Sequence, residues 1–283
     1  MIYLVRYAEI ALKGKNRKDF ENKLVENLRV CARNSGFEIK INKIQGRFLV
    51  VCDNEIDFRK VFGIVSFSPC IRTELELEAI FSEALKIAEK YSKTSTFRIS
   101  AKKLTKDFGL SSMELNSKVG AFIAEKTGFK VKLDKPDLDF GIELIGKEAF
   151  VFDKTIACFG GLPVGIEGKV LVLLSDEQSV LAGLLMMKRG CAIEIVGFSE
   201  VSVRELSLLQ AFCPYKLVFH KVNVASELDK IALSLGCKAF IAGDTICDLP
   251  VYPINIIILR PLVAFSDSEI KAELDKFRKE SFE

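Results

Sequence analysis

The sequence has no tryptophan, a single histidine and, among its eight cysteines, no Cys-x-x-Cys pair. Without paired cysteines, neither a zinc site nor a dithiol redox motif is indicated. The one histidine, His220, leaves no second candidate for a Ser-His-Asp or Cys-His arrangement. It falls in a predicted strand and is expected to be structural. The cysteines, including Cys191 and Cys237, are expected to be reduced, inert core residues of a cytosolic protein.

The sequence also has no apolar run of the roughly 18 residues that a membrane-spanning helix needs, and its first residues lack the layout of a signal peptide. At 283 residues, with 49% hydrophobic and 28% charged residues, it has the composition of a well-packed soluble protein of two or three domains. We therefore expect a cytoplasmic protein that has no membrane partner.

Positive charge is concentrated in the first half of the chain. Residues 1–55 contain 11 Lys and Arg against 7 Asp and Glu, and residues 93–135 contain 10 against 4. Residues 166–283 contain 13 against 16 and are mildly acidic. This asymmetry favours a polyanionic partner for the first half, although ordinary solubility charge would explain it as well.

The first block of the chain predicts a β-α-β-β order. Apolar residues recur at helical spacing at Phe20, Leu24, Leu28 and Cys31, and Gln45-Gly46 is a hairpin signal between two strands. This order is the beginning of a ferredoxin-like, or split β-α-β, unit. The predicted elements are strands 2–7, 37–44 and 47–51 and helices 19–34 and 57–62.

The next block mixes strands and helices and includes a basic loop. Lys102, Lys103 and Lys106 precede a helix that Ser112 can cap. A capped helix N-terminus beside three lysines is a suitable phosphate site. The predicted elements are strands 68–73, 96–101, 130–133, 138–145 and 149–153 and helices 77–91 and 113–127.

The last block follows a Gly/Pro linker at residues 160–165 and alternates strands with helices. This alternation predicts a doubly wound parallel α/β sheet. The predicted elements are strands 170–174, 192–197, 216–222 and 239–242, a further segment 255–259, and helices 180–188, 203–212, 225–235 and 267–279.

The loop Ser175-Asp-Glu-Gln-Ser179 lies where this sheet would bind a nucleotide, between a buried strand and a helix N-terminus. Its chemistry conflicts with that position. It has no glycine to let backbone N–H groups approach a phosphate, and it has two carboxylates, Asp176 and Glu177, that would repel one.

Several stretches together resemble the tRNA thiouridine synthetases, a family with an N-terminal ferredoxin-like domain, a THUMP RNA-binding domain and a PP-loop ATP-pyrophosphatase domain. The resemblance covers essentially the whole chain, and its N-terminal signature is specific. The matching stretches are residues 7–21, 97–108, 111–115, 136–138, 160–165, 168–175, 184–190 and 258–263.

The resemblance implies three domains, at residues 1–62 (ferredoxin-like), 63–165 (THUMP) and 166–283 (PP-loop type). It makes contact with the RNA backbone the favoured interpretation of the basic residues, for which a solvated surface is the alternative. These candidate RNA-binding residues are Lys13, Lys15, Arg17, Lys18, Lys102, Lys103, Lys106, Ser112, Lys130 and Lys132.

This sequence departs from the family in its last third. The family's loop is Ser-Gly-Gly-x-Asp-Ser, whereas the loop at 175–179 is one residue shorter and has neither glycine. The stretch 224–236 is short, and 243–251 only faintly echoes the family's Gly-Glu-Ser-Leu-Gly-Gln motif. The chain also stops at Glu283, before the segment that holds the family's catalytic cysteine. Ser175, Ser179 and Asp244 are therefore candidate remnants of an ATP site. For the two serines the favoured interpretation is a turn and an N-cap, and for Asp244 it is the cap of a turn.

These features predict a tRNA-binding protein of tRNA thio-modification that has no catalytic residues of its own and for which ATP binding is doubtful. An active ATP-dependent tRNA sulfurtransferase is the alternative, and it would need a separate sulfur donor. A small-molecule enzyme that reuses the crevice of the sheet is a more distant possibility. The resemblance also implies a homodimer, and no metal site is expected.

Overall fold

The computed structural model describes residues 1–92, 95–199 and 202–282, and its segments group into two compact units. The first unit consists of Met1–Arg6, Phe37–Ile56 and Ser66–Ala157. The second consists of Tyr7–Gly36, Asp57–Val65 and Cys158–Glu283. The domain boundaries at residues 62 and 165 stay a prediction.

The first unit contains an antiparallel five-stranded sheet, called the first sheet. Its strand order is β10-β4-β1-β3-β2. Its two central strands are rich in branched apolar residues, and the middle three residues of each are buried. The strands are β1 (Ile2–Arg6), β2 (Lys40–Ile44), β3 (Arg47–Val51), β4 (Ser66–Pro69) and β10 (Ile156–Ala157).

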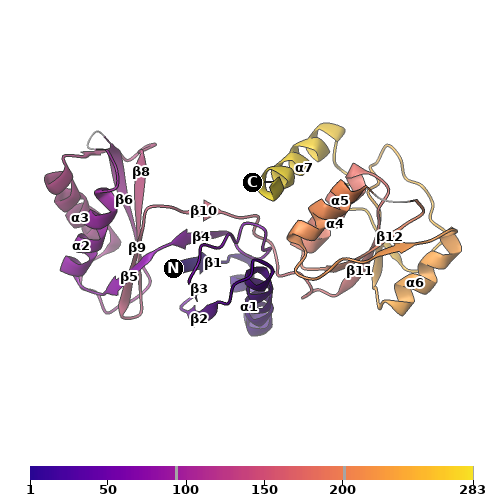
Figure 1. Cartoon of the computed structure of the whole chain (residues 1–283), viewed down its shortest axis with the longest axis horizontal. Coiled ribbons are helices and arrows are strands. Elements are labelled where there is room, and N and C mark those ends of the chain that lie inside the picture. Colours follow the sequence, from indigo (N-terminus) through magenta and orange to yellow (C-terminus); the bar gives the residue numbers. More distant parts are fainter. Residues whose placement is uncertain (93–94, 200–201, 283) are drawn as a thin grey trace. The chain divides into compact units, whose positions relative to one another are not determined.

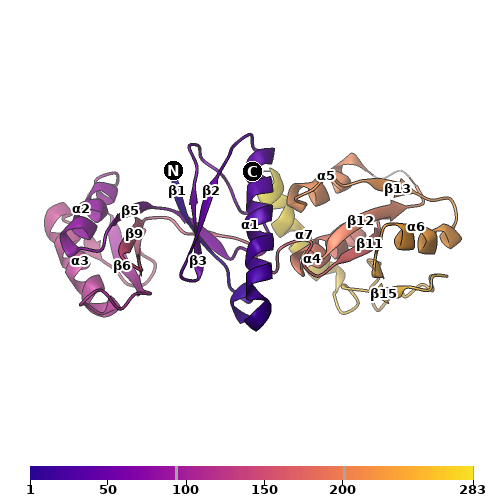
Figure 2. The ribbon, with the colours of Figure 1, turned by 90° about the horizontal axis from the view of Figure 1, so that it is seen from below.

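The second sheet, in the same unit, has the order β5-β9-β8-β6-β7. Helices α2 (Leu77–Ala88) and α3 (Ser112–Thr127) both cover one of its faces, as Figure 2 shows, and enclose a core around Phe97, Phe140 and Ile142. The strands are β5 (Ile71–Glu74), β6 (Thr96–Lys103), β7 (Lys130–Val131), β8 (Leu138–Ile145) and β9 (Glu148–Phe152).

The chain crosses between these two sheets twice, each time through a short link. Cys70 alone separates β4 from β5, and residues 153–155 separate β9 from β10. The single strand predicted at 68–73 is therefore wrong, because Pro69 ends a strand of one sheet and Ile71 begins a strand of the other.

The second unit contains the third sheet, whose five strands are all parallel, in the order β13-β12-β11-β14-β15. This is the predicted doubly wound arrangement, with helices on both faces (Figure 1). The strands are β11 (Lys169–Leu173), β12 (Ala192–Gly197), β13 (Phe219–Lys221), β14 (Ala239–Ile241) and β15 (Ile257–Leu259).

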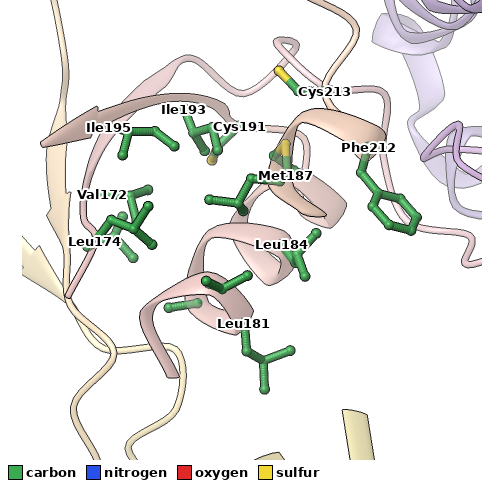
Figure 3. Packing of buried hydrophobic residues seen from close by; sticks show 14 of the residues in the cluster. Val172, Leu174, Leu181, Leu184, Met187, Cys191, Ile193, Ile195, Phe212 and Cys213 are labelled. Carbon is green, nitrogen blue, oxygen red and sulfur yellow. The ribbon is translucent and has the colours of Figure 1, made fainter. Parts of the chain in front are cut away.

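Helices α4 (Glu177–Lys188), α5 (Val203–Phe212) and α7 (Asp267–Phe282) share one core with one face of the third sheet. Figure 3 shows the strand residues of this face directed at the apolar side of α4. The opposite face packs against α6 (Leu228–Ser234), which the short turn η3 (Ala225–Glu227) precedes. The other helical segments of the unit are η1 (Glu9–Leu12), η2 (Gly14–Asn16) and α1 (Arg17–Asn34).

Two predicted helices differ from the structure. Residues 57–62 form turns, because the Asp57 carboxylate accepts a hydrogen bond from the backbone N–H of Arg59 at 2.8 Å, and this local bond competes with a helix. The helix predicted at 225–235 starts as a single 3₁₀ turn before α6. Among the residues described, no helix has the length and apolarity needed to cross a membrane.

Candidate nucleotide cleft and RNA-binding surfaces

A cleft of about 760 Å³ lies at the carboxyl end of β11 and β14, beside the N-terminus of α4 and against α7. This is the position at which parallel sheets of this type bind ligands. Its charged lining is mostly acidic, with five carboxylates and two basic side chains. The carboxylates are those of Asp176, Glu177, Asp244, Asp248 and Asp267, and the basic residues are Lys271 and Arg278.

The loop at the bottom of the cleft is closed by hydrogen bonds within itself. The hydroxyl oxygen of Ser179 accepts hydrogen bonds from the backbone N–H groups of Ser175 (3.0 Å) and Asp176 (3.1 Å). The Asp176 carboxylate accepts one from the backbone N–H of Ser179 at 2.8 Å and is the N-cap of α4. Since these N–H groups already have acceptors, they are not available to a phosphate.

Glycine is required where β14 leads into the cleft. A Cβ atom on Gly243 would lie 2.6 Å from the backbone nitrogen of Ser179, which is closer than such atoms approach. The strand end and the loop therefore touch through their backbones. This close contact keeps Ser179 buried, with 1% of the residue exposed.

Asp244, predicted to be a remnant of an ATP site, is held by two side chains. Its carboxylate accepts hydrogen bonds from the Tyr252 hydroxyl and from Nε of Arg260, each at 2.8 Å. Burial and the hydrogen bond to Asp244 both raise the pKa of Tyr252. Glu177, which also lines the cleft, forms an ion pair with Arg278 of α7.

The basic stretch 102–106, which is the end of β6 and the start of the loop after it, contains two kinds of lysine. The ammonium group of Lys103 donates to the backbone carbonyls of Phe108 and of Leu110 (3.1 Å for the latter), so it organises the loop from inside. Lys102 and Lys106 are exposed, and their ammonium groups have no partner within the described residues. Lys102 and Lys106 are thus the loop's accessible cations.

The predicted cap of α3 is wrong by one residue. Ser111 is the N-cap, and it forms a reciprocal capping box with Glu114, whose pKa these hydrogen bonds lower. The Ser112 hydroxyl instead accepts a hydrogen bond from the backbone N–H of Lys103 at 3.2 Å. The sequence was ambiguous here because two serines stand side by side.

Lys130 and Lys132 are exposed, but at the opposite end of β6 from Lys102. In the parallel register, Lys130 pairs with Thr96 at the start of β6. Lys102 lies six positions after Thr96 along the strand, a span of about 20 Å. The two lysine groups are therefore separate parts of the second sheet's surface.

In the N-terminal basic segment, two of the four candidates are engaged internally. Arg17 donates to Glu21 (2.7 Å) and to the Tyr7 hydroxyl (2.8 Å), and Lys13 forms an ion pair with Glu167 at 3.3 Å. Burial, followed by the hydrogen bond to Glu21, raises the pKa of Tyr7. The other two candidates, Lys15 and Lys18, are exposed and have no ion pair within the described part of the chain.

Comparison with protein-family models matches two parts of this chain. Residues 2–68 match the ThiI ferredoxin-like domain, and residues 74–152 match the THUMP domain.

Three relatives are each described as a probable tRNA sulfurtransferase. The Brevibacillus brevis protein is 37% identical over 95% of this chain and 80% of its own length, and the Thermococcus kodakarensis protein is 31% identical over 95% and 85%. The protein of Thermoanaerobacter sp. (strain X514) is 39% identical over 70% of this chain, which spans 53%, about half, of that relative. The Thermococcus match extends over 332 residues, more than the 283 of this chain, so that relative has residues with no counterpart here.

Two solved structures are similar over 98% of the chain. A protein of Pyrococcus horikoshii Ot3 has a TM-score of 0.84 at 29% identity, with 99% of that chain covered. A 4-thiouridine synthetase, solved in complex with RNA and with bound ATP, has a TM-score of 0.79 at 30% identity, with 84% covered.

Proposed function

Because the chain belongs to the tRNA sulfurtransferase family, we propose that it binds tRNA and takes part in tRNA thio-modification without adenylating the tRNA itself. The THUMP match at residues 74–152 and the RNA bound to the similar synthetase support the choice of RNA. The exposed lysines Lys15, Lys18, Lys102 and Lys106 are suited to contacts with phosphates, which position an RNA without reading its sequence.

The observation that supports the missing adenylation activity is the internal closure of the loop at 175–179. In a phosphate-binding loop, glycines let successive backbone N–H groups point at the phosphate oxygens. Here the N–H groups of Ser175 and Asp176 point at the hydroxyl of Ser179, and that of Ser179 points at a carboxylate.

The residues around the cleft do not fit a triphosphate. A phosphate placed at the N-terminus of α4 would meet the carboxylates of Asp176 and Glu177, and like charges in a partly desolvated site repel strongly. Arg278, one of the two basic residues that line the cleft, is already paired with Glu177. ATP binding would require the ion pair and the loop hydrogen bonds to break.

The second candidate is an active ATP-dependent tRNA sulfurtransferase that receives sulfur from a separate donor protein. The place of the cleft favours it, because the carboxyl edge of a parallel sheet is the usual nucleotide position and 760 Å³ is large enough for one. Under this proposal Ser175, Ser179 and Asp244 would contact ATP.

The test is binding of an unmodified tRNA transcript with and without ATP, followed by an assay of ATP-dependent tRNA thiolation with a persulfide donor. We expect tRNA binding that ATP leaves unchanged, and no thiolation. Calorimetry should give no ATP binding for the wild type and measurable binding for Asp176→Gly with Glu177→Gly. Micromolar ATP binding by the wild type, or thiolation, would favour the second candidate.

We also propose the homodimer that the family resemblance implies. Sedimentation equilibrium of the purified chain tests it, and a monomer at every concentration would refute it. The cytoplasmic location and a separate partner enzyme are part of the same proposal.

A further inference from the structure

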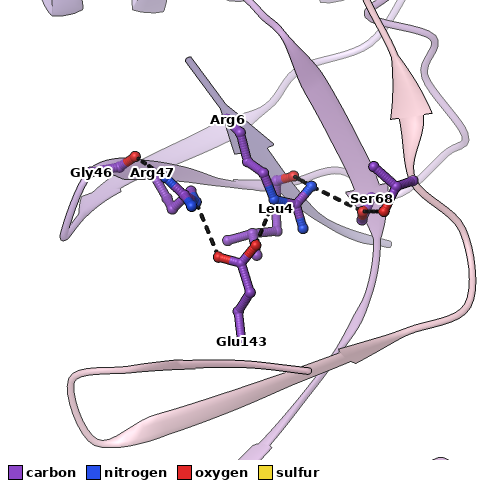
Figure 4. A network of polar contacts seen from close by, with 7 residues as sticks. Leu4, Arg6, Gly46, Arg47, Ser68 and Glu143 are labelled. Atoms are coloured by element: carbon purple, nitrogen blue, oxygen red, sulfur yellow. Dashed lines mark hydrogen bonds and ion pairs between the residues drawn. The ribbon is translucent and has the colours of Figure 1, made fainter. Parts of the chain in front are cut away.

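One carboxylate connects the two sheets of the first unit. Glu143 lies in β8 of the second sheet, and only 7% of its side chain is exposed. Its Oε1 accepts a hydrogen bond from Nε of Arg6 at 2.6 Å, and its Oε2 accepts one from Nε of Arg47 at 3.0 Å (Figure 4). Both arginines belong to the first sheet. Each carboxylate oxygen thus binds a different strand of that sheet.

The two arginines are held in place by the first sheet. Arg6 and Arg47 are direct partners in the register of β1 and β3, so their side chains start side by side. Arg6 also donates through Nη1 to the Ser68 hydroxyl of the first sheet at 3.0 Å. Its guanidinium lies 4.9 Å from the centre of the ring of Phe152, which belongs to β9 of the second sheet and adds a contact between the sheets. Arg47 donates to the Gly46 carbonyl at 2.8 Å. These contacts leave the guanidinium groups little freedom to follow a moving carboxylate.

The other connections between the sheets constrain their angle less. An apolar cluster joins them, and apolar contacts have no preferred direction. The chain links at Cys70 and at residues 153–155 are short. A carboxylate that binds two guanidinium groups has a defined geometry. Together with the contact between Arg6 and the Phe152 ring, the ion pairs of Glu143 give the junction of the sheets a preferred geometry. The apolar cluster is made of Leu4, Leu49, Ile145, Phe150 and Phe152.

The contact between the sheets has two positive charges and one negative charge, so its stability depends on the charge of Glu143. Two buried guanidinium groups face one carboxylate, and Nη2 of Arg6 has no hydrogen-bond partner within the described structure. Removal of the negative charge leaves two buried cations next to each other, which repel and lack a counterion. Both cations belong to the first sheet, so neutralisation of Glu143 removes the attraction that holds the second sheet to them and should loosen the contact between the sheets.

We propose that Glu143 is a positioning residue that holds the ferredoxin-like and THUMP sheets as one body, so that both engage a single RNA molecule. The inference rests on the proposed RNA binding. Arg6 and Arg47 lie within the matched ferredoxin-like region, and Glu143 lies within the matched THUMP region.

The test compares Glu143→Gln with the control Glu148→Gln in full-length protein. Glu148 is on the next strand, and its ion pair with Arg72 is partly exposed. Spin labels at Asn42→Cys in β2 and Glu125→Cys in α3, in a Cys247→Ser chain, report the distance between the sheets. We expect Glu143→Gln to lengthen and widen the distance distribution and the control to leave it unchanged.

We expect Glu143→Gln to weaken binding of an unmodified tRNA transcript about tenfold, a usual size for coupling between sites. The salt dependence should flatten, because one sheet's cations no longer contact the RNA.

An unchanged distance distribution in Glu143→Gln would overturn the proposal, and so would a widened distribution with wild-type tRNA affinity. Absence of tRNA binding by the wild type would instead refute the proposed function, and the distance measurement distinguishes the two failures. If Glu143→Gln does not fold, Arg47→Gln replaces it, since it keeps the Arg6–Glu143 pair. Arg47→Gln should widen the distance distribution relative to the wild type, because one of the two ion pairs is lost. An unchanged distribution in this variant would overturn the proposal.

Discussion

The hydroxyl of Ser179 donates a hydrogen bond to the backbone carbonyl of Asp176 at 2.6 Å, while the Asp176 carboxylate accepts one from the backbone N–H of Ser179 at 2.8 Å. This reciprocal pair closes the loop at the start of α4. A side-chain oxygen thus takes the hydrogen bonds that a bound phosphate would need. The loop lies where parallel sheets of this type bind ligands, and its backbone N–H groups have acceptors without a ligand.

The first prediction concerns the stability of this loop. Ser179→Ala removes the acceptor of two backbone N–H groups, those of Ser175 and Asp176, in a buried place. We expect a loss of about 1–3 kcal/mol in the free energy of unfolding, measured with urea. Ser234→Ala is the control, because its hydroxyl makes one exposed hydrogen bond to Ile231. Equal losses in the two variants would contradict the prediction.

The second prediction separates the lysines of the basic loop. Lys102→Ala with Lys106→Ala should weaken tRNA binding and reduce the slope of log affinity against log salt by about 2, because two phosphate contacts are lost. Lys103→Ala should mainly destabilise the loop, since its ammonium group binds backbone carbonyls. Filter binding at several salt concentrations and urea unfolding measure the two effects. A wild-type salt slope in the double variant would remove this loop from the RNA contact surface.

The third prediction concerns acid stability. Hydrogen bonds from the backbone N–H (2.8 Å) and hydroxyl (2.7 Å) of Thr96 hold the pKa of Asp137 below its usual value. A carboxyl with a lowered folded-state pKa stabilises the protein fully above its unfolded-state pKa of about 3.9 and loses this effect as the pH falls through the folded-state value. The difference in unfolding free energy between the wild type and Asp137→Asn should therefore be larger at pH 6 than at pH 3.

Asp134→Asn is the control for that comparison, because Asp134 is exposed and its carboxylate has no hydrogen-bond partner among the described residues. Its effect on stability should be small at both pH values. A difference for Asp137→Asn that does not change with pH would show that the hydrogen bonds to Thr96 do not favour the charged carboxylate.

The fourth prediction concerns thiol reactivity. Burial raises the pKa of Cys31, Cys213 and Cys237 to about 11 and that of Cys158 to about 12, so these thiols stay protonated near neutral pH. Cys247 is exposed. Iodoacetamide at pH 8 should modify Cys247 first, as mass spectrometry of peptides will show, and all eight cysteines should react in urea. Modification of Cys237 as fast as Cys247 would contradict this interpretation.

Much of the fold followed from local patterns. The alternation of buried strands and amphipathic helices after residue 165 predicted the parallel third sheet, and β8, β12 and α5 have the bounds that the sequence indicated. Local patterns gave a wrong prediction at residues 68–73, where tertiary contacts determine to which sheet each residue belongs. Pro69 and Ile71 have strand-forming neighbours on both sides, and only their different partners show that they belong to two sheets.

For the candidate site, the sequence by itself determined the absence of glycine at 175–179, the excess of carboxylates there and the surplus of lysines in the first half of the chain. These properties depend on residue type and order alone. Only the tertiary structure decided which lysines are available and what Glu143 does. Lys103 and Arg17 are engaged by the protein itself, whereas Lys102 and Lys18 are exposed, because neighbouring carbonyls and carboxylates reach only some cations. Glu143, to which both Arg6 and Arg47 donate, is 137 and 96 residues away from them in the sequence, and no local pattern predicts such contacts.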